Sequence, residues 1–176
     1  MLIVEASTLD LEDVLFVERE AFGEEGVAEL VRQLLDDCSA RPLLSLLARD
    51  GERAIGHILF TTARLDDAPR AVSIAILAPL AVVPEAQGMG IGGQLIEQGI
   101  RRLSQSGVEL VIVLGHPEYY PRHGFEPASR HGLAAPFPIS PEDAWMVRPL
   151  HPDVIGCVHG NVVCSDAMNK PEHWRE

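Results

Sequence analysis

The spacing of apolar residues changes along the chain near residue 43. Before this point, apolar residues recur every three or four positions in two segments, residues 11–22 and 27–35, which predicts two amphipathic helices. Gly23 ends the first pattern and Pro42 closes the helical pair, since neither residue continues a helix readily. A short apolar stretch at residues 2–5 comes first and predicts an initial strand.

From residue 43 onward the apolar pattern is typical of strands. Residues 43–65 predict two strands around an Asp50-Gly51 turn, a dipeptide common in tight hairpins. A third strand is expected at residues 71–83, and it contains Pro79. Because proline donates no backbone hydrogen bond, this strand must carry a bulge or a break in its pairing.

A strand, a helix and a second strand follow one another between residues 80 and 115. The apolar run from Leu80 stops at Pro84, and helical spacing then extends from Ile91 toward Gly107,. Residues 108–115 form an apolar run, as in a strand buried on both faces. This order predicts a right-handed crossover between two parallel strands. Two further strands are expected at residues 144–150 and 154–164.

Length and composition indicate one soluble globular domain over residues 1–176, with 47% hydrophobic and 23% charged residues,. The chain has no apolar run of membrane-spanning length and no signal-peptide pattern, so the cytoplasm is expected. Its three cysteines lack zinc-ligand spacing, and no metal site is predicted. The net charge of −12 argues against nucleic acid and anionic membranes as partners. It agrees with a cationic substrate, and equally with solubility alone.

The turn into the predicted helix, residues 87–93, contains four glycines. A helix start leaves backbone N–H groups unpaired at the positive end of the helix dipole. Glycine has no Cβ, so the backbone itself can approach a phosphate or pyrophosphate. The turn therefore predicts an anion-binding site, and the alternative is a glycine-rich connection without a ligand.

Three phosphate-binding motifs can be compared with this turn. A P-loop is excluded because no Lys follows Gly92 or Gly93,. Gly88, Gly90 and Gly93 match the dinucleotide fingerprint GxGxxG literally, but four residues separate the strand from the first glycine. The acidic residue expected about 20 positions further on could only be Glu109, which opens the next strand instead of closing it. The third pattern is QxxGxG, which Gln87, Gly90 and Gly92 satisfy.

Preceded by Val-Val-Pro-Glu, the QxxGxG pattern resembles motif A of the GNAT superfamily of acetyl-CoA-dependent N-acetyltransferases, whose loop binds the coenzyme pyrophosphate. A second segment, residues 115–125, matches the YxxxGF pattern of this family through Tyr120, Gly124 and Phe125. The run Gly-His-Pro-Glu-Tyr-Tyr looks most like the branch labelled YhbS-like. One departure is that many members have a longer helix beginning with Asn here, and contacts of that Asn cannot be transferred to this chain.

The resemblance implies an α/β (α+β) GNAT fold: a mixed, mostly antiparallel, twisted sheet of six to seven strands with helices on both faces. A V-shaped opening between the fourth and fifth strands would admit the pantetheine arm of acetyl-CoA, the expected cosubstrate. The acceptor would be a primary amine on a small molecule or peptide, and a homodimer is compatible with the sequence. The expected coenzyme-binding residues are Leu80, Ala81, Val82, Val83, Gln87, Gly88, Met89, Gly90, Ile91, Gly92, Gly93 and Tyr120.

Tyr120 is the expected general acid, because a phenol can protonate the departing thiolate of coenzyme A. The spacing to Gly124 favours it over Tyr119, and a purely structural tyrosine is the alternative. A base for the protonated amine is harder to find, since residues 73–83 contain no acid. Four residues remain candidates, and His116 at the end of the buried strand is preferred: Glu85, His57, His116 and Glu118.

Two other functions are compatible with the sequence. The chain could bind acyl-CoA without catalysing transfer, and less favourably it could bind a dinucleotide. Retention of both Tyr120 and the glycine turn favours the enzyme.

Overall fold

A mixed β-sheet in the order β1-β2-β3-β4-β5-β8-β6 forms the centre of the computed structural model, which describes residues 1–175. β9 pairs with the far end of β3, and β7 pairs with β9. The β4–β5 and β7–β9 pairs are parallel and the other pairs are antiparallel. The strands are β1 (Leu2–Glu5), β2 (Leu44–Asp50), β3 (Arg53–Asp66), β4 (Ile74–Val82), β5 (Leu110–Leu114), β6 (Glu126–Pro127), β7 (Leu133–Ala134), β8 (Trp145–Pro149) and β9 (Gly160–Val163).

The mixed, mostly antiparallel sheet is as predicted, but it has nine strands where six to seven were expected. β6 and β7 have two residues each, too few to produce an apolar alternation. The strand expected at residues 154–164 is also shorter, since only Gly160–Val163 pairs. Gly156 just before it has a left-handed φ of 82°, which a regular strand does not accommodate.

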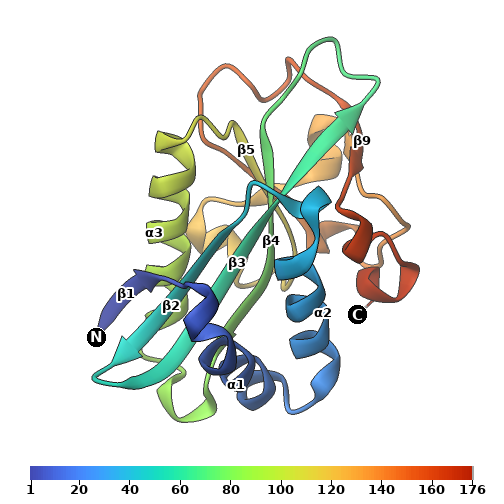
Figure 1. The fold of residues 1–176 in the computed structure, drawn as a ribbon. Coiled ribbons are helices and arrows are strands. Elements are labelled where there is room, and N and C mark those ends of the chain that lie inside the picture. The colour runs from blue at the N-terminus through green and yellow to red at the C-terminus, as the bar shows by residue number, and fades with distance from the viewer. Residues whose placement is uncertain (176) are drawn as a thin grey trace.

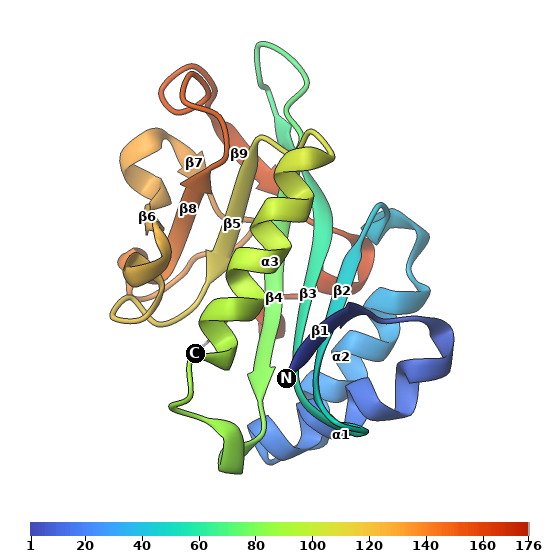
Figure 2. The ribbon, with the colours of Figure 1, turned by 90° about the vertical axis from the view of Figure 1, so that its left-hand side faces the viewer.

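Helices cover both faces of the sheet, as expected. α1 (Leu11–Phe22) and α2 (Glu25–Asp36) lie on one face, and α3 (Ile91–Gln105) lies on the other (Figures 1 and 2). Each helix buries one stripe, which for α3 consists of Ile91, Leu95, Ile96, Gly99, Ile100 and Leu103. The predicted crossover from β4 through α3 to the parallel strand β5 is confirmed.

Two local features follow their sequence signals closely. β2 and β3 form a hairpin in which Asp50 pairs with Arg53, and Gly51 takes a left-handed φ of 61°. In the β3–β4 pair, Ile58 lies opposite Leu80 but Phe60 lies opposite Leu77. One extra residue of β4 is therefore accommodated next to Pro79, which is the predicted bulge.

Candidate active site

β4 and β5 separate at the bulge and leave an opening in the sheet. They pair from Ile74–Leu110 to Leu77–Val113, and β5 ends one residue later, whereas β4 continues to Val82 (Figure 2). β3 still pairs with the other edge of this part of β4. The predicted opening between the fourth and fifth strands is thus present, and it begins at the bulge beside Pro79.

Backbone groups of β4 face this opening at every second residue. The N–H of Val83 donates to the carbonyl of Ile55 at 3.0 Å, so by antiparallel alternation Ala81 also faces β3, while Leu80 and Val82 face the opening. The Val82 carbonyl accepts the side-chain amide of Gln87 at 3.0 Å. Among the four residues predicted to bind pantetheine, Leu80 is therefore the one whose N–H and C=O are best placed.

The glycine turn presents an uncapped helix start. Gly88 and Gly90 have φ of 76° and 79°, and a Cβ at either would meet no atom within 4 Å. Gly90 is the N-cap of α3, and neither a capping side chain nor an acidic residue occupies the first turn. Met89 between them is exposed. The unpaired N–H groups of this turn form the site that an anion such as pyrophosphate prefers.

Gly92 and Gly93 have no room for a side chain, which the sequence alone did not reveal. A Cβ at Gly92 would lie 2.7 Å from the Tyr119 hydroxyl oxygen and 3.5 Å from Leu80 Cδ2. A Cβ at Gly93 would lie 2.9 Å from Cε1 of His123. These two glycines let the first turn of α3 pack against the segment that carries both tyrosines.

Tyr120 begins a 3-10 turn, Tyr120–His123, shortly after β5. Its ring is buried against Gly115 and meets the Phe125 ring edge-on at a centroid distance of 5.5 Å. Gly124 closes the turn with a left-handed φ of 81°, which explains the Gly-Phe pair of the motif. Burial raises the pKa of the Tyr120 phenol, so this group keeps its proton at neutral pH.

Tyr119 lies beside Tyr120, with ring centroids 5.1 Å apart. Burial raises the pKa of the Tyr119 phenol, and the nearby Arg122 opposes this effect. Its hydroxyl lies next to Gly92, at the start of α3. The structure thus brings both tyrosines to the segment that follows β5.

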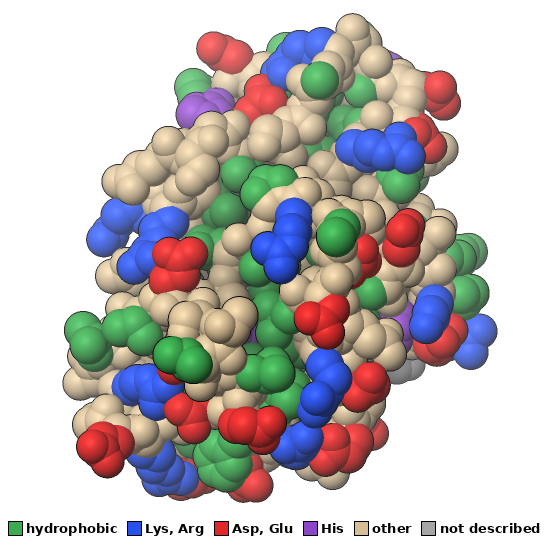
Figure 3. Space-filling model, viewed as in Figure 1, with side chains coloured by type: hydrophobic (Ala, Val, Ile, Leu, Met, Phe, Trp, Pro, Cys, Tyr) green, Lys and Arg blue, Asp and Glu red, His purple; other side chains and the backbone are tan. Residues whose placement is uncertain are grey.

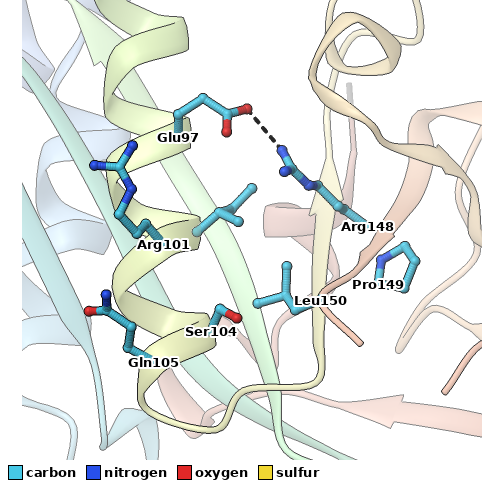
Figure 4. Close-up of a pocket in the computed structure, with 8 residues that line it drawn as sticks. Glu97, Arg101, Ser104, Gln105, Arg148, Pro149 and Leu150 are labelled. Atoms are coloured by element: carbon cyan, nitrogen blue, oxygen red, sulfur yellow. Dashed lines mark hydrogen bonds and ion pairs between the residues drawn. The ribbon is translucent and has the colours of Figure 1, made fainter. Parts of the chain in front are cut away.

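Arg148 ties this segment to the rest of the fold, and sequence reasoning did not find it. Its Nη1 donates to the His123 carbonyl at 2.8 Å and to Glu97 Oε1 at 2.9 Å. The Glu97–Arg148 pair bridges α3 and β8 above a cavity of about 380 Å³, with Arg101 and Leu150 further along it (Figure 4). The pair therefore fixes the 3-10 turn of Tyr120 against α3.

The four base candidates lie in different environments. His116 is exposed directly after β5 and lines a cavity of about 440 Å³ with Glu118 and Tyr119. Glu85 forms an exposed ion pair with Arg53. His57 is fully buried, and its ring nitrogens contact Ser45 and Glu18. His116 and Glu118 are therefore the candidates with open access.

Within residues 1–175, no group of three or more His, Cys, Asp or Glu residues could hold a metal ion. The three cysteines are free, and Cys38 and Cys157 are exposed. Acidic and basic side chains intermingle over the face shown in Figure 3 and form no continuous basic patch there. In the same described range, no helix has the length and apolar character needed to cross a membrane.

Glu109, the residue that a ribose ligand would need, is occupied elsewhere. It pairs with Arg70 at 2.8 Å and accepts the backbone N–H of Ser73 at 2.9 Å. Gly88 also lies six positions beyond Val82, the last residue of β4. Both observations speak against dinucleotide binding.

Known proteins resemble the chain in sequence. The family profile described as "Acetyltransferase (GNAT) domain" matches residues 42–127. Escherichia coli YjhQ, an uncharacterized N-acetyltransferase, is 49% identical over 160 residues, which cover 89% of this chain and 88% of YjhQ. Escherichia coli YhbS, also an uncharacterized N-acetyltransferase, is 32% identical over 97% of this chain and 99% of its own length.

Solved structures agree with this assignment. The crystal structure of Escherichia coli YhbS in complex with CoA has a TM-score of 0.88 and 30% identity, and the match covers 96% of this chain and 92% of that one. A GNAT family acetyltransferase from Brucella melitensis in complex with acetyl-CoA has a TM-score of 0.75 and 25% identity, with coverage of 95% and 97%. The chain therefore belongs to the GNAT family of acetyl-CoA-dependent N-acetyltransferases, as the sequence predicted.

Proposed function

We propose that the chain transfers an acetyl group from acetyl-CoA directly to a primary amine at the opening between β4 and β5. The observation that carries this proposal is the separation of the two strands after Leu77 and Val113, next to the uncapped start of α3. Leu80 would pair with the pantetheine amides, and residues 87–93 would hold the pyrophosphate. The YhbS complex with CoA and the Brucella melitensis complex with acetyl-CoA support acetyl-CoA as the cosubstrate.

Tyr120 is the general acid in this proposal. The amine nitrogen attacks the thioester carbon, the C–N bond forms, and the C–S bond breaks when the tetrahedral intermediate collapses. The departing thiolate takes a proton from the Tyr120 hydroxyl, whose raised pKa keeps it protonated beforehand,. Tyr120 later recovers a proton from solvent.

The amine must lose a proton before or during its attack. An alkylamine has a pKa of about 10.4 and is mostly protonated at neutral pH. His116, exposed after β5, is the proposed base, and water is the competitor for this role. The net charge of −12 agrees with a cationic acceptor, either a small molecule or a peptide.

Two further assignments belong to the proposal. We place the enzyme in the cytoplasm, where its free thiols would stay reduced. We also treat residues 1–176 as a single catalytic domain, because strands from β1 to β9 join one sheet.

The proposal is tested by turnover of acetyl-CoA with a panel of amines: a polyamine, a lysine peptide, a peptide with a free N-terminus and an aminoglycoside. Thiol release is followed with a thiol reagent, and the acetylated amine is identified by mass spectrometry. We expect product and free coenzyme A in equal amounts with at least one amine. Calorimetric binding of acetyl-CoA without any amine-dependent thiol release would instead support a binding module.

A further inference from the structure

Three buried side chains from different elements form a continuous hydrogen-bonded chain outside the coenzyme site. Ser45 Oγ on β2 lies 2.8 Å from His57 Nε2 on β3, and His57 Nδ1 lies 2.6 Å from Glu18 Oε1 on α1. Glu18 and His57 are completely buried, and Ser45 is 5% exposed. The atoms connect in the order hydroxyl, Nε2, Nδ1, carboxylate, which is the order found in nucleophilic serine triads.

This order determines where the protons lie when Glu18 is ionised. The carboxylate accepts the proton on Nδ1, so Nε2 carries a lone pair and accepts the hydroxyl proton of Ser45. The same histidine tautomer is the one that activates a serine for attack on an acyl carbon.

The fold alone gives little reason to retain this cluster. Glu18 Oε2 is buried and has no hydrogen-bond partner, although buried polar atoms normally have one. A carboxylate in this position is costly, and apolar residues of similar volume would pack there without that cost. A buried carboxylate oxygen without a partner is more typical of a functional site than of a packed core.

Ser45 is the member of the cluster that solvent can reach. It lines a cavity of about 410 Å³ between the end of β1, the start of α1 and the end of α2. Leu11 and Val14 contribute apolar walls, and the charged lining residues are Glu5, Arg32, Asp36 and Arg41. Arg41 Nη2 also donates to the Leu35 carbonyl at 3.2 Å. Ser45 is 5% exposed and lines the cavity, whereas His57 and Glu18 are completely buried.

This cavity is separate from the coenzyme site. β3 lies between β2, which carries Ser45, and β4, which borders the opening. His57 pairs with Ala81 of β4 through the backbone, but its two ring nitrogens contact Ser45 and Glu18. Neither nitrogen is available to an amine at the opening, so the relay serves the cavity at Ser45.

We propose that Ser45, His57 and Glu18 form a second catalytic site that hydrolyses small carboxylic esters independently of acetyl-CoA. Ser45 Oγ bonds to the acyl carbon while its proton passes to His57 Nε2. The ester C–O bond then breaks, and the leaving alkoxide takes that proton and departs as an alcohol. Water attacks the acyl-serine with His57 as base, and the products are a carboxylic acid and the restored serine. Arg32 and Arg41, which line the same cavity, are the cationic residues we assign to the oxyanion.

The test uses the full-length chain without acetyl-CoA. The protein is treated with a fluorophosphonate probe, and its peptides are mapped by mass spectrometry. We expect one adduct, on Ser45. Hydrolysis of p-nitrophenyl acetate in Ser45→Ala should fall to the rate of an equal amount of heat-unfolded protein, and Ser129→Ala, an exposed serine on another segment, should keep the wild-type rate.

A second variant, Glu18→Gln, tests the roles of His57 and Glu18. Glu18→Gln keeps an acceptor for His57 Nδ1 but removes the charge, and probe labelling should slow by about tenfold or more. Absence of a Ser45 adduct on saturated wild-type protein overturns the proposal without requiring any variant to fold. Wild-type ester hydrolysis in Ser45→Ala overturns it as well. Because no acetyl-CoA is present, either failure leaves acetyl transfer at the other site untouched.

Discussion

Replacing Gly115 by alanine should displace the ring of Tyr120 without altering the ring itself. A Cβ at Gly115 would lie 2.9 Å from Tyr120 Cδ2 and closer still to Cε2, whereas ordinary contact begins at 3.4 Å. The ring must therefore move by more than 0.5 Å, which is the 3.4 Å contact distance minus the 2.9 Å from the Cβ to Tyr120 Cδ2. Gly115 is not among the glycines with positive φ, so alanine fits the local backbone.

Two effects of different size follow from this displacement. Overpacking costs roughly 1–3 kcal/mol, equivalent to a fall of about 2–12 °C in Tm for a chain of this length. A shift of about 1 Å in a catalytic group costs about 100-fold in rate, so kcat for acetyl transfer should fall about tenfold or more. Coenzyme affinity should change little, because the expected pyrophosphate contacts are on residues 87–93.

The assay measures kcat, the Kd for coenzyme A and Tm on the same preparation. Gly26→Ala is the matched control, since its Cβ would meet only Glu24 Oε1 at 3.6 Å, and it should keep wild-type kcat with equal or higher Tm. A folded Gly115→Ala enzyme with wild-type kcat would show that the position of Tyr120 does not govern the reaction. If kcat fell equally in Gly26→Ala, the loss in Gly115→Ala could not be assigned to the position of Tyr120.

Three other substitutions test separate parts of the account. Gly90→Asp should abolish calorimetric binding of coenzyme A by placing a carboxylate at the pyrophosphate site, while Gly51→Asp, also at a left-handed glycine, should bind normally. His116→Ala should lower kcat while the Kd for coenzyme A stays unchanged, because the proposed base would be lost and the pyrophosphate contacts would remain; an unaltered kcat would assign deprotonation to water. Glu18→Gln is the third substitution. Burial raises the pKa of Glu18, so at pH values between its unfolded and native pKa the native state binds one proton more than the unfolded state. The native state therefore loses stability as pH rises through that range. Denaturant unfolding should therefore show that Glu18→Gln gains stability relative to wild type as pH rises from about pH 4. A difference in unfolding free energy that does not change with pH would contradict this.

Local patterns predicted most elements of the fold because these elements bury one continuous stripe or run. The helices over residues 11–22 and 27–35 correspond to α1 and α2, and Pro79 correctly indicated the bulge. β6 and β7 could not be predicted, since two residues carry no periodicity. They depend on the position of β8 and β9 instead.

The part of the candidate site that could be predicted is the part whose functional residue and backbone turn lie within a few residues of each other. The spacing from Tyr120 to Gly124 reflects a 3-10 turn closed by a left-handed glycine, and spacing of this kind is visible in sequence. The contact between Tyr119 and Gly92 is not visible in sequence, because it joins the start of α3 to the segment after β5. The Ser45–His57 and His57–Glu18 contacts likewise join residues 12 and 39 positions apart, and only the fold brings them together.

Tyr120→Phe tests whether the Tyr120 hydroxyl protonates the departing coenzyme A. This substitution removes one oxygen and keeps the buried ring, so the Kd for coenzyme A and the Tm should stay close to wild type. We predict that kcat for acetyl transfer falls by roughly 100-fold to 10,000-fold, while Tyr119→Phe keeps most of its activity. Wild-type kcat in Tyr120→Phe would contradict the claim, and loss of turnover in Tyr119→Phe alone would assign the proton to the neighbouring hydroxyl beside Gly92.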